Sequence, residues 1–206
     1  MSVESGRVGP ADAPAKARGR PRSEPARRAI LAAATELMLA RGLSAVSMDA
    51  IAEKAGVSKA TIYRWWPTKE TLALEALFDE WTVQPDVTPD TGSLRDDLLA
   101  LLLPWVERIG DRPYGRIAGA LITEARTDPV FGELYRTQFV TTRRQMAREI
   151  FQRALGRGEI APGTDIEAAM DMIYGPLYHR LLQGHAPLTE DFARTVVSVV
   201  VAGLRP

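Results

Sequence analysis

A pair of short amphipathic segments, residues 48–55 and 58–66, limits what this chain can fold into more than any other feature. Two helices of this length can cross closely only where a small side chain lies between them, and Ala52 supplies it. The turn that joins them needs a residue that tolerates positive φ, which Gly56 does. Ile62 can then be buried against the first helix. These separations predict a helix-turn-helix, whose second helix lies in the major groove of DNA.

The rest of the chain also predicts helices, because apolar residues recur at helical spacing and no segment alternates as a strand does. The fold class is therefore all-α, with about nine helices. A basic, disordered tail is expected over residues 1–24, followed by a DNA-binding head over 25–70 and a larger body over 71–206. The expected helices span about residues 25–41, 48–55, 58–66, 69–81, 94–110, 114–126, 128–155, 165–183 and 189–204.

Charge is distributed unevenly along the chain, although 26 Lys and Arg balance 26 Asp and Glu. Residues 1–70 carry 12 basic against 7 acidic side chains, and residues 71–206 carry 14 against 19. A basic end on an acidic body favours a polyanion-binding surface, with a solvated tail as the alternative. No stretch predicts a membrane span or a secretory signal, so we expect a cytoplasmic protein.

Enzyme chemistry has little support in the residues. The chain has no cysteine, which excludes disulfides, thiolate metal sites and a cysteine nucleophile. Its two histidines, His179 and His185, are six residues apart and so do not share a helix face, as a metal-binding pair would. No glycine-rich phosphate loop and no Gly-x-Ser-x-Gly elbow is present. We therefore expect no enzyme, no metal and no cofactor, and keep a helical enzyme as the remote alternative.

The segment GVSKATIYRWWPTKETL, residues 56–72, closely resembles the signature of the TetR family of transcriptional regulators. Residues 28–34 and 47–52 match the family as well, and the specific resemblance covers about residues 25–78. It implies an all-helical homodimer on a palindromic, double-stranded operator. Three N-terminal helices would bind DNA, and the fourth would connect them to a body that senses a ligand and forms the dimer.

The resemblance also implies the DNA contacts. The chain deviates from the family pattern at the two positions after Arg64. It has two tryptophans there, whereas the family commonly has His or Tyr at the first position and Phe at the second. Trp65 is kept as a DNA contact, and Trp66 is expected to pack the head onto the fourth helix. The residues expected to face the major groove are Ser58, Lys59, Ala60, Thr61 and Arg64. Those expected to touch phosphates are Ser47, Thr61, Tyr63 and Lys69.

The tail holds a further candidate DNA contact, the tract Arg18-Gly19-Arg20-Pro21-Arg22. It resembles the core of an AT-hook, an extended basic segment that lies in a narrow minor groove. A plain flexible tail is the alternative.

Residues 189–204 are too apolar for a lone surface helix, so we expect two of its faces to be covered. The resemblance to the TetR family implies that the last two helices pair with their copies in a four-helix dimer interface. The recognition helices would then lie about 34–36 Å apart, one turn of DNA. The alternative is burial within one subunit. The interface residues expected from this pairing are Ile173, Leu177, Leu181, Phe192, Val196, Val199 and Val200.

A binding site for an unknown small-molecule effector is expected among the central helices of the body. Pro176 should bend its helix and open a cavity there. We expect an apolar or aromatic ligand that releases a repressor from its operator, and the alternative is a regulator controlled by a protein partner. The lining residues expected are Trp105, Ile109, Ile117, Leu121, Phe139, Met146, Tyr174 and Tyr178, each of which suits a plain core position equally well.

Overall fold

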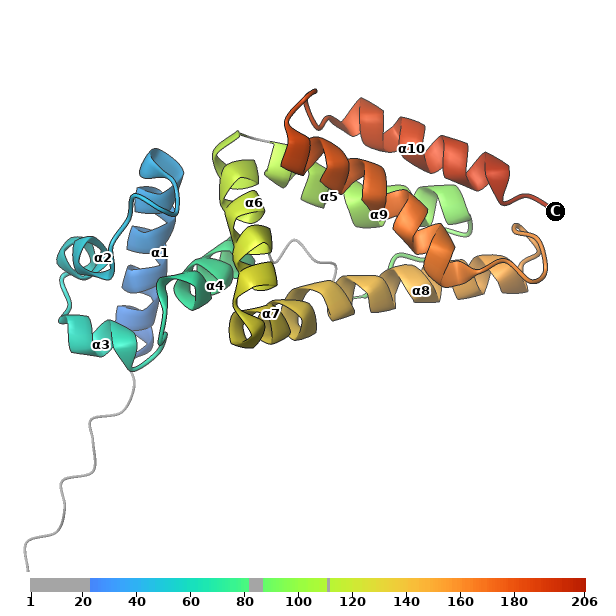
Figure 1. Ribbon diagram of the computed structural model, residues 1–206. Helices are drawn as coiled ribbons and strands as arrows, with labels where there is room; N and C mark the ends of the chain where they lie inside the picture. The colour runs from blue at the N-terminus through green and yellow to red at the C-terminus, as the bar shows by residue number, and fades with distance from the viewer. Residues whose placement is uncertain (1–22, 82–86, 111) are drawn as a thin grey trace, which may run out of the picture.

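The structure is a computed structural model that describes residues 23–81, 87–110 and 112–206, and all regular secondary structure in these residues is helical. Figure 1 shows the helices in chain order. Their bounds are α1 Glu24–Arg41, α2 Met48–Ala55, α3 Lys59–Tyr63, α4 Lys69–Trp81, α5 Leu94–Gly110, α6 Arg112–Thr127, α7 Pro129–Tyr135, the π-helix η1 Arg136–Val140, α8 Thr141–Gly156, α9 Ile166–Gln183 and α10 Glu190–Gly203.

Side-chain caps explain where most of these helices begin. The Asp128 carboxylate accepts hydrogen bonds from the first backbone amides of α7, and Pro129 occupies the first helical position, where its missing N–H costs nothing. Asp165 and Thr189 cap α9 and α10 in the same way. These are the residues at which the sequence predicts helix starts.

Two elements differ from the expected bounds. The recognition helix α3 ends at Tyr63 instead of Trp66, because Pro67 disfavours a helical conformation at the residue before it and the chain unwinds early. The single helix expected over residues 128–155 contains the five-residue π-helix η1. A π-turn changes the hydrogen-bond register without a proline or glycine, so apolar periodicity does not reveal it.

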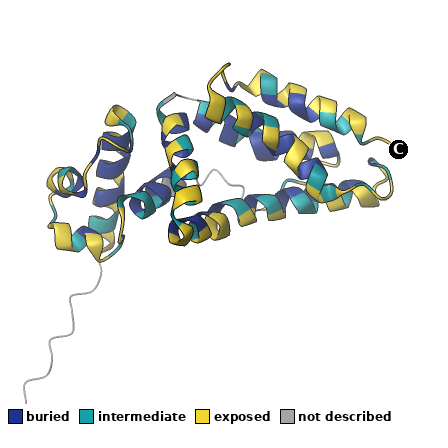
Figure 2. Ribbon diagram, in the orientation of Figure 1, coloured by how far each residue is buried: buried dark blue, intermediate teal, exposed yellow. Residues whose placement is uncertain are grey.

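The head and the body are joined through α4 and through a direct contact between α1 and α6. Helix α4 packs on α1 of the head and also contacts α6 and α7 of the body. In the body, α5 lies at the centre and contacts α6, α8, α9 and α10. Figures 1 and 2 show α1, α2 and α3 at one end of the molecule, with buried residues of the body concentrated on α5. Across the described ranges, no helix combines the length and apolar character needed to span a membrane.

Candidate nucleic-acid interface and ligand cavity

Helices α2 and α3 form the helix-turn-helix that the sequence predicts. The Ser47 hydroxyl accepts from the Ala50 amide at 3.2 Å and starts α2, and the Ser58 hydroxyl accepts from the Thr61 amide at 3.2 Å and starts α3. Between them Gly56 has a φ of 65°, the left-handed conformation that favours glycine. The three apolar residues of the crossing, Ile51, Ala52 and Ile62, are all buried.

The side of α3 that faces away from α2 is accessible. Figure 2 shows this outer side of the head as mostly exposed. Of the residues predicted to contact DNA, Thr61, Trp65 and Lys69 are half-buried, and Tyr63 is 45% exposed. The others in the described part of the chain are exposed: Ser47, Ser58, Lys59, Ala60 and Arg64. The candidates in the tail, Arg18, Arg20 and Arg22, lie outside the described residues.

An acidic side chain on α2 holds the lysine of α3. The Lys59 ammonium lies 2.8 Å from Oδ1 and 2.9 Å from Oδ2 of Asp49. This hydrogen-bonded ion pair raises the pKa of Lys59, which stays positively charged. Both side chains are exposed, so the ammonium can exchange the carboxylate for a phosphate or a base edge.

Trp66 joins the end of the helix-turn-helix to α4, as the sequence predicts. Its ring is 2% exposed, and its indole Nε1 donates to Glu75 Oε2 at 2.6 Å. The other oxygen of Glu75 pairs with the Arg27 guanidinium from α1. Glu75 therefore ties together α1, α4 and the turn after α3. Trp65 stacks on Trp66, with ring centroids 5.9 Å apart.

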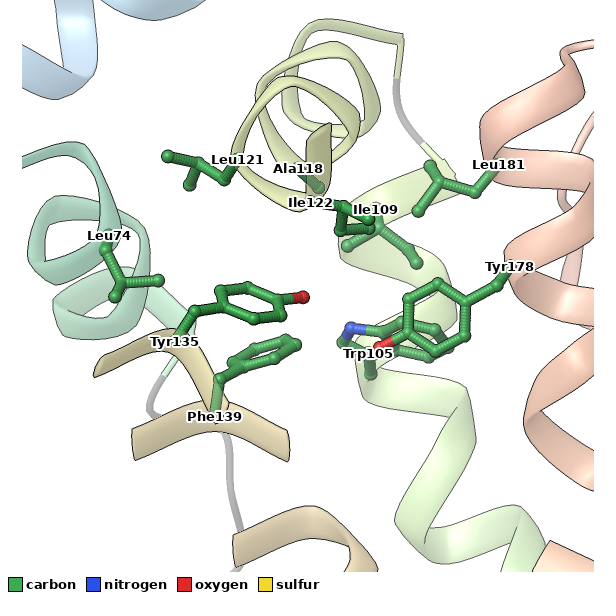
Figure 3. A pocket seen from close by; sticks show the side chains of 10 residues that line it. All are labelled: Leu74, Trp105, Ile109, Ala118, Leu121, Ile122, Tyr135, Phe139, Tyr178 and Leu181. Carbon is green, nitrogen blue, oxygen red and sulfur yellow. The ribbon is translucent and has the colours of Figure 1, made fainter. Parts of the chain in front are cut away.

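The body contains a small, aromatic cavity among six of its helical elements (Figure 3). Its volume is about 10 Å³, close to the least that holds one water molecule. A ligand of any size must therefore displace side chains to enter. The lining residues are Leu74 from α4, Trp105 and Ile109 from α5, Ala118, Leu121 and Ile122 from α6, Tyr135 from α7, Phe139 from η1, and Tyr178 and Leu181 from α9.

Five of the predicted effector residues line this cavity: Trp105, Ile109, Leu121, Phe139 and Tyr178. The other three, Ile117, Met146 and Tyr174, are buried in the core beside it. Tyr174 packs edge-on against Trp105, with ring centroids 6.4 Å apart.

Sequence reasoning missed half of the cavity. Leu181, which the sequence analysis assigned to the dimer interface, lines the cavity, and Leu74 reaches it from α4. Tyr135 was also missed, although a signal exists. Phe131, Tyr135 and Phe139 are spaced four residues apart, and their tilted rings pack one after another, with centroids 6.4 Å and 5.2 Å apart. Such a row marks one aromatic face of a helix. The other residues missed are Ala118 and Ile122.

Arg143, which the sequence analysis did not select, packs against two of the rings that line the cavity. Its side chain is buried, and its guanidinium carbon lies 4.4 Å from the Phe139 ring centroid and 4.9 Å from that of Trp105. Burial raises the pKa of Tyr135 and Tyr178, so both keep their hydroxyl protons at neutral pH.

The residues predicted at a dimer interface are divided by the structure between core and surface. Ile173 and Leu177 of α9 are fully buried within the subunit. On α10, Val196 is buried, and Phe192 and Val200 are partly buried. Val199 is 67% exposed. On α9 the exposed apolar side chains are instead Met172 and Leu182. Periodicity identified apolar positions correctly, but the subunit's own core uses several of them.

The two histidines lie side by side, although their spacing predicted that they would not share a face. The His179 and His185 ring centroids are 5.0 Å apart. Gly184, in a left-handed conformation with φ 62°, ends α9 and folds the following residue back. Within the described residues, no group of three His, Cys, Asp or Glu side chains could hold a metal ion.

An all-helical body behind an exposed helix-turn-helix defines a DNA-binding transcription regulator. Two family models match the chain: one for bacterial regulatory proteins of the tetR family over residues 30–76, and one for the tetracyclin repressor-like C-terminal domain over residues 88–200. The chain belongs to the TetR family of transcriptional regulators.

The similarity to known proteins extends over nearly the whole chain. The HTH-type transcriptional regulator YdeS of Bacillus subtilis is 36% identical over 91% of this chain and 94% of its own length. A DNA-binding transcriptional repressor TetR of Mycobacteroides abscessus is 32% identical over 92% of this chain and 97% of its own length. The crystal structure of the TetR family transcription regulator SCO0332 is 36% identical, has a TM-score of 0.71, and is matched over 89% of this chain and 100% of that one.

Proposed function

We propose that this TetR-family regulator is a repressor that binds a palindromic operator as a homodimer and leaves it when a small apolar or aromatic molecule enters the cavity of the body. One observation carries the ligand response. Neighbouring residues of α4 face the two sites: Leu74 lines the cavity, and Glu75 holds Trp66 and Arg27 of the head. Repression itself is consistent with the repressor among the relatives.

The coupling follows from the rigidity of a helix. A ligand that enlarges the cavity pushes against Leu74, and a movement of α4 carries Glu75 with it. The bonds of Glu75 to the head then turn α3 or change its distance from the α3 of the other subunit. A ligand acts in this way only if it binds the displaced state better than the DNA-bound state.

The proposed DNA contacts are those of the sequence prediction. Ser58, Lys59, Ala60 and Arg64 offer an exposed, basic face on α3 that suits the major groove. Tyr63 lies beside it, is 45% exposed, and carries a hydroxyl that suits a phosphate. We keep the division into a head over residues 25–70 and a body over 71–206, with α4 as the connection.

The proposed dimer surface combines α9 and α10. On α9, the exposed residues Met172, His179 and Leu182 recur at the spacing of one helix face. On α10, Val199 is exposed beside the small residue Ala202. Small and apolar side chains on adjacent helices allow close packing against a second copy.

The test uses the full-length protein and its own upstream DNA. We expect footprinting to reveal a palindromic site, and a ligand found by screening to weaken binding there. Ala118→Leu adds bulk to the cavity wall and should keep operator binding while losing the ligand response. Ala120→Leu, on the exposed side of the same helix, is the matched control. If no small molecule changes DNA affinity, the protein is a regulator controlled by a partner instead.

A further inference from the structure

Arg143 is a buried cation that pairs with no carboxylate of the described residues. Its side chain is 8% exposed, and its Nε has no hydrogen-bond partner in that part of the chain. The electrostatic neighbours of its charge are the phenols Tyr135, Tyr174 and Tyr178. The next arginine on the helix contrasts with it, because Arg144 binds Asp171 at 2.6 Å and Glu167 at 2.7 Å.

The tyrosines do not neutralise this charge. Burial raises the pKa of all three, that of Tyr174 to about 12, so each remains an uncharged phenol at neutral pH. A guanidinium in a protein keeps its proton, so Arg143 brings a full positive charge into an apolar core. Such a charge is costly unless an anion compensates it.

Further polar groups meet at the same place, where the hydroxyls of Tyr135 and Tyr178 are hydrogen-bonded to each other. The Trp105 indole Nε1 is buried, and no residue that the structure describes accepts a hydrogen bond from it. Figure 3 shows this nitrogen and the hydroxyl oxygens of Tyr135 and Tyr178 pointing toward the middle of the cavity. The Arg143 guanidinium lies behind the Phe139 and Trp105 rings, which form part of the cavity wall. One end of an apolar cavity is thus rich in hydrogen-bond donors.

We infer that the effector is an apolar or aromatic acid whose carboxylate is bound by Arg143, with the Trp105 indole N–H and the Tyr178 hydroxyl as further donors. This inference rests on the proposed ligand-responsive function. The guanidinium fork matches the two oxygens of a carboxylate. The hydrocarbon part of the ligand would lie among Leu121, Ile122 and Leu181.

The route of the carboxylate to Arg143 passes the Phe139 ring. Phe139 belongs to the π-helix η1, and π-turns within α-helices are frequent at functional sites. Rotation of this ring opens the wall between the cavity and the guanidinium.

The experiment measures binding to the full-length protein by calorimetry and by the shift in Tm. The probes are naphthoic, cinnamic and decanoic acid, each beside its primary amide, which has the same shape without the charge. We expect at least one acid to bind about tenfold tighter than its amide, since hydrogen bonds to charged groups are the stronger ones. The acid that binds should also release operator DNA.

Variants assign the effect to one side chain. Arg143→Met should weaken binding of the acid by about tenfold or more and leave its amide unchanged. Trp105→Phe keeps a ring but removes the N–H donor, so it should weaken binding of the acid less than Arg143→Met does. Arg144→Met, which removes an ion-paired arginine from the same helix, is the matched control and should leave both ligands unchanged. Circular dichroism checks that each variant is folded.

The alternative outcomes separate this inference from the function on which it rests. If amides bind as tightly as acids, or if Arg143→Met binds the acid like the wild type, the cavity senses ligands but the acid assignment is wrong. If no probe binds and a broad screen finds a neutral effector, the acid assignment is again overturned while the sensor function stands. If neither the probes nor the compounds of the broad screen change Tm or DNA binding, the acid assignment and the sensor function are both overturned.

Discussion

The Trp66 indole donates a 2.6 Å hydrogen bond to Glu75, and this bond connects the last turn of the helix-turn-helix to α4. Trp66 is fully buried, so the bond is protected from competing water. Because Glu75 also pairs with Arg27, one carboxylate of α4 holds both α1 and the turn after α3. The orientation of α3 relative to the body is therefore set by a charged hydrogen-bond network as well as by apolar packing.

Glu75→Gln tests this network. Glutamine keeps the length of the side chain but removes the charge that Arg27 and Trp66 share. We expect the free energy of unfolding to fall by about 1–2 kcal/mol, and DNA affinity to fall with it because α3 is held less firmly. Urea unfolding and fluorescence anisotropy with operator DNA measure the two effects. Glu70→Gln makes an equal charge change on α4 and is the control. It should change the free energy of unfolding and the DNA affinity much less than Glu75→Gln does.

Asp49→Asn should strengthen DNA binding. The substitution frees Lys59 from its ion pair and removes a negative charge from the exposed side of the head. We expect operator affinity at 0.1 M salt to rise by about three- to tenfold, because the carboxylate no longer repels the DNA or competes for the lysine, with a steeper dependence on salt. Anisotropy over a salt series measures this. Glu53→Gln on the same helix is the control, and an equal gain there would show that net charge alone is responsible.

Lys59→Ala and Tyr63→Phe should separate base reading from phosphate anchoring. The lysine is expected at a base edge, so its loss should lower affinity for the operator by about tenfold and relax the preferred sequence at one position per half-site. The tyrosine hydroxyl is expected on a phosphate, so its loss should weaken all sequences alike. Selection from a randomised duplex library reads out both. Identical sequence preferences for the two variants would contradict the division of roles.

Val199→Asp should break the dimer. Val199 is 67% exposed on α10, so the substitution costs the isolated subunit little, but it buries a carboxylate if this surface meets its copy. We expect monomers in sedimentation at micromolar concentration and, because both heads no longer bind together, operator affinity lower by about a hundredfold or more. Val130→Asp, at a position 82% exposed on α7, is the control. A dimeric Val199→Asp variant would place the interface elsewhere.

The sequence was most informative where one local rule decides the structure. Ser47, Gly56 and Ser58 fix the turn between α2 and α3, because caps and positive φ are properties of single residues. It was less informative where a residue's partner is distant. Periodicity showed that Ile173, Leu177 and Leu181 are apolar positions of one helix. It could not distinguish between a subunit core, a cavity wall and a second subunit, which all favour the same side chains.

Arg143 could not be predicted as part of the site, since arginine is almost never buried without a partner. It follows Phe131, Tyr135 and Phe139 at four-residue spacing, but a charge in such a row is ordinarily read as the point where the buried face ends. The π-helix η1 was hidden for a related reason. A single wider turn shifts the face of a helix without any residue type that marks it.

Arg143→Met should stabilise the protein while damaging ligand recognition. Methionine is apolar and flexible and can fill the same space, so the variant avoids the cost of a buried charge without a carboxylate. The loss of the contacts with the Phe139 and Trp105 rings opposes this gain. We expect a net rise of about 1–3 kcal/mol in the free energy of unfolding, measured by urea unfolding without ligand. Arg144→Met, which breaks partly exposed ion pairs, should change it by about 0–1 kcal/mol in the destabilising direction. A side chain that serves ligand binding lowers the stability of the protein without its ligand. A strongly destabilised Arg143→Met variant would therefore mean that the Arg143 cation is a structural element of the core.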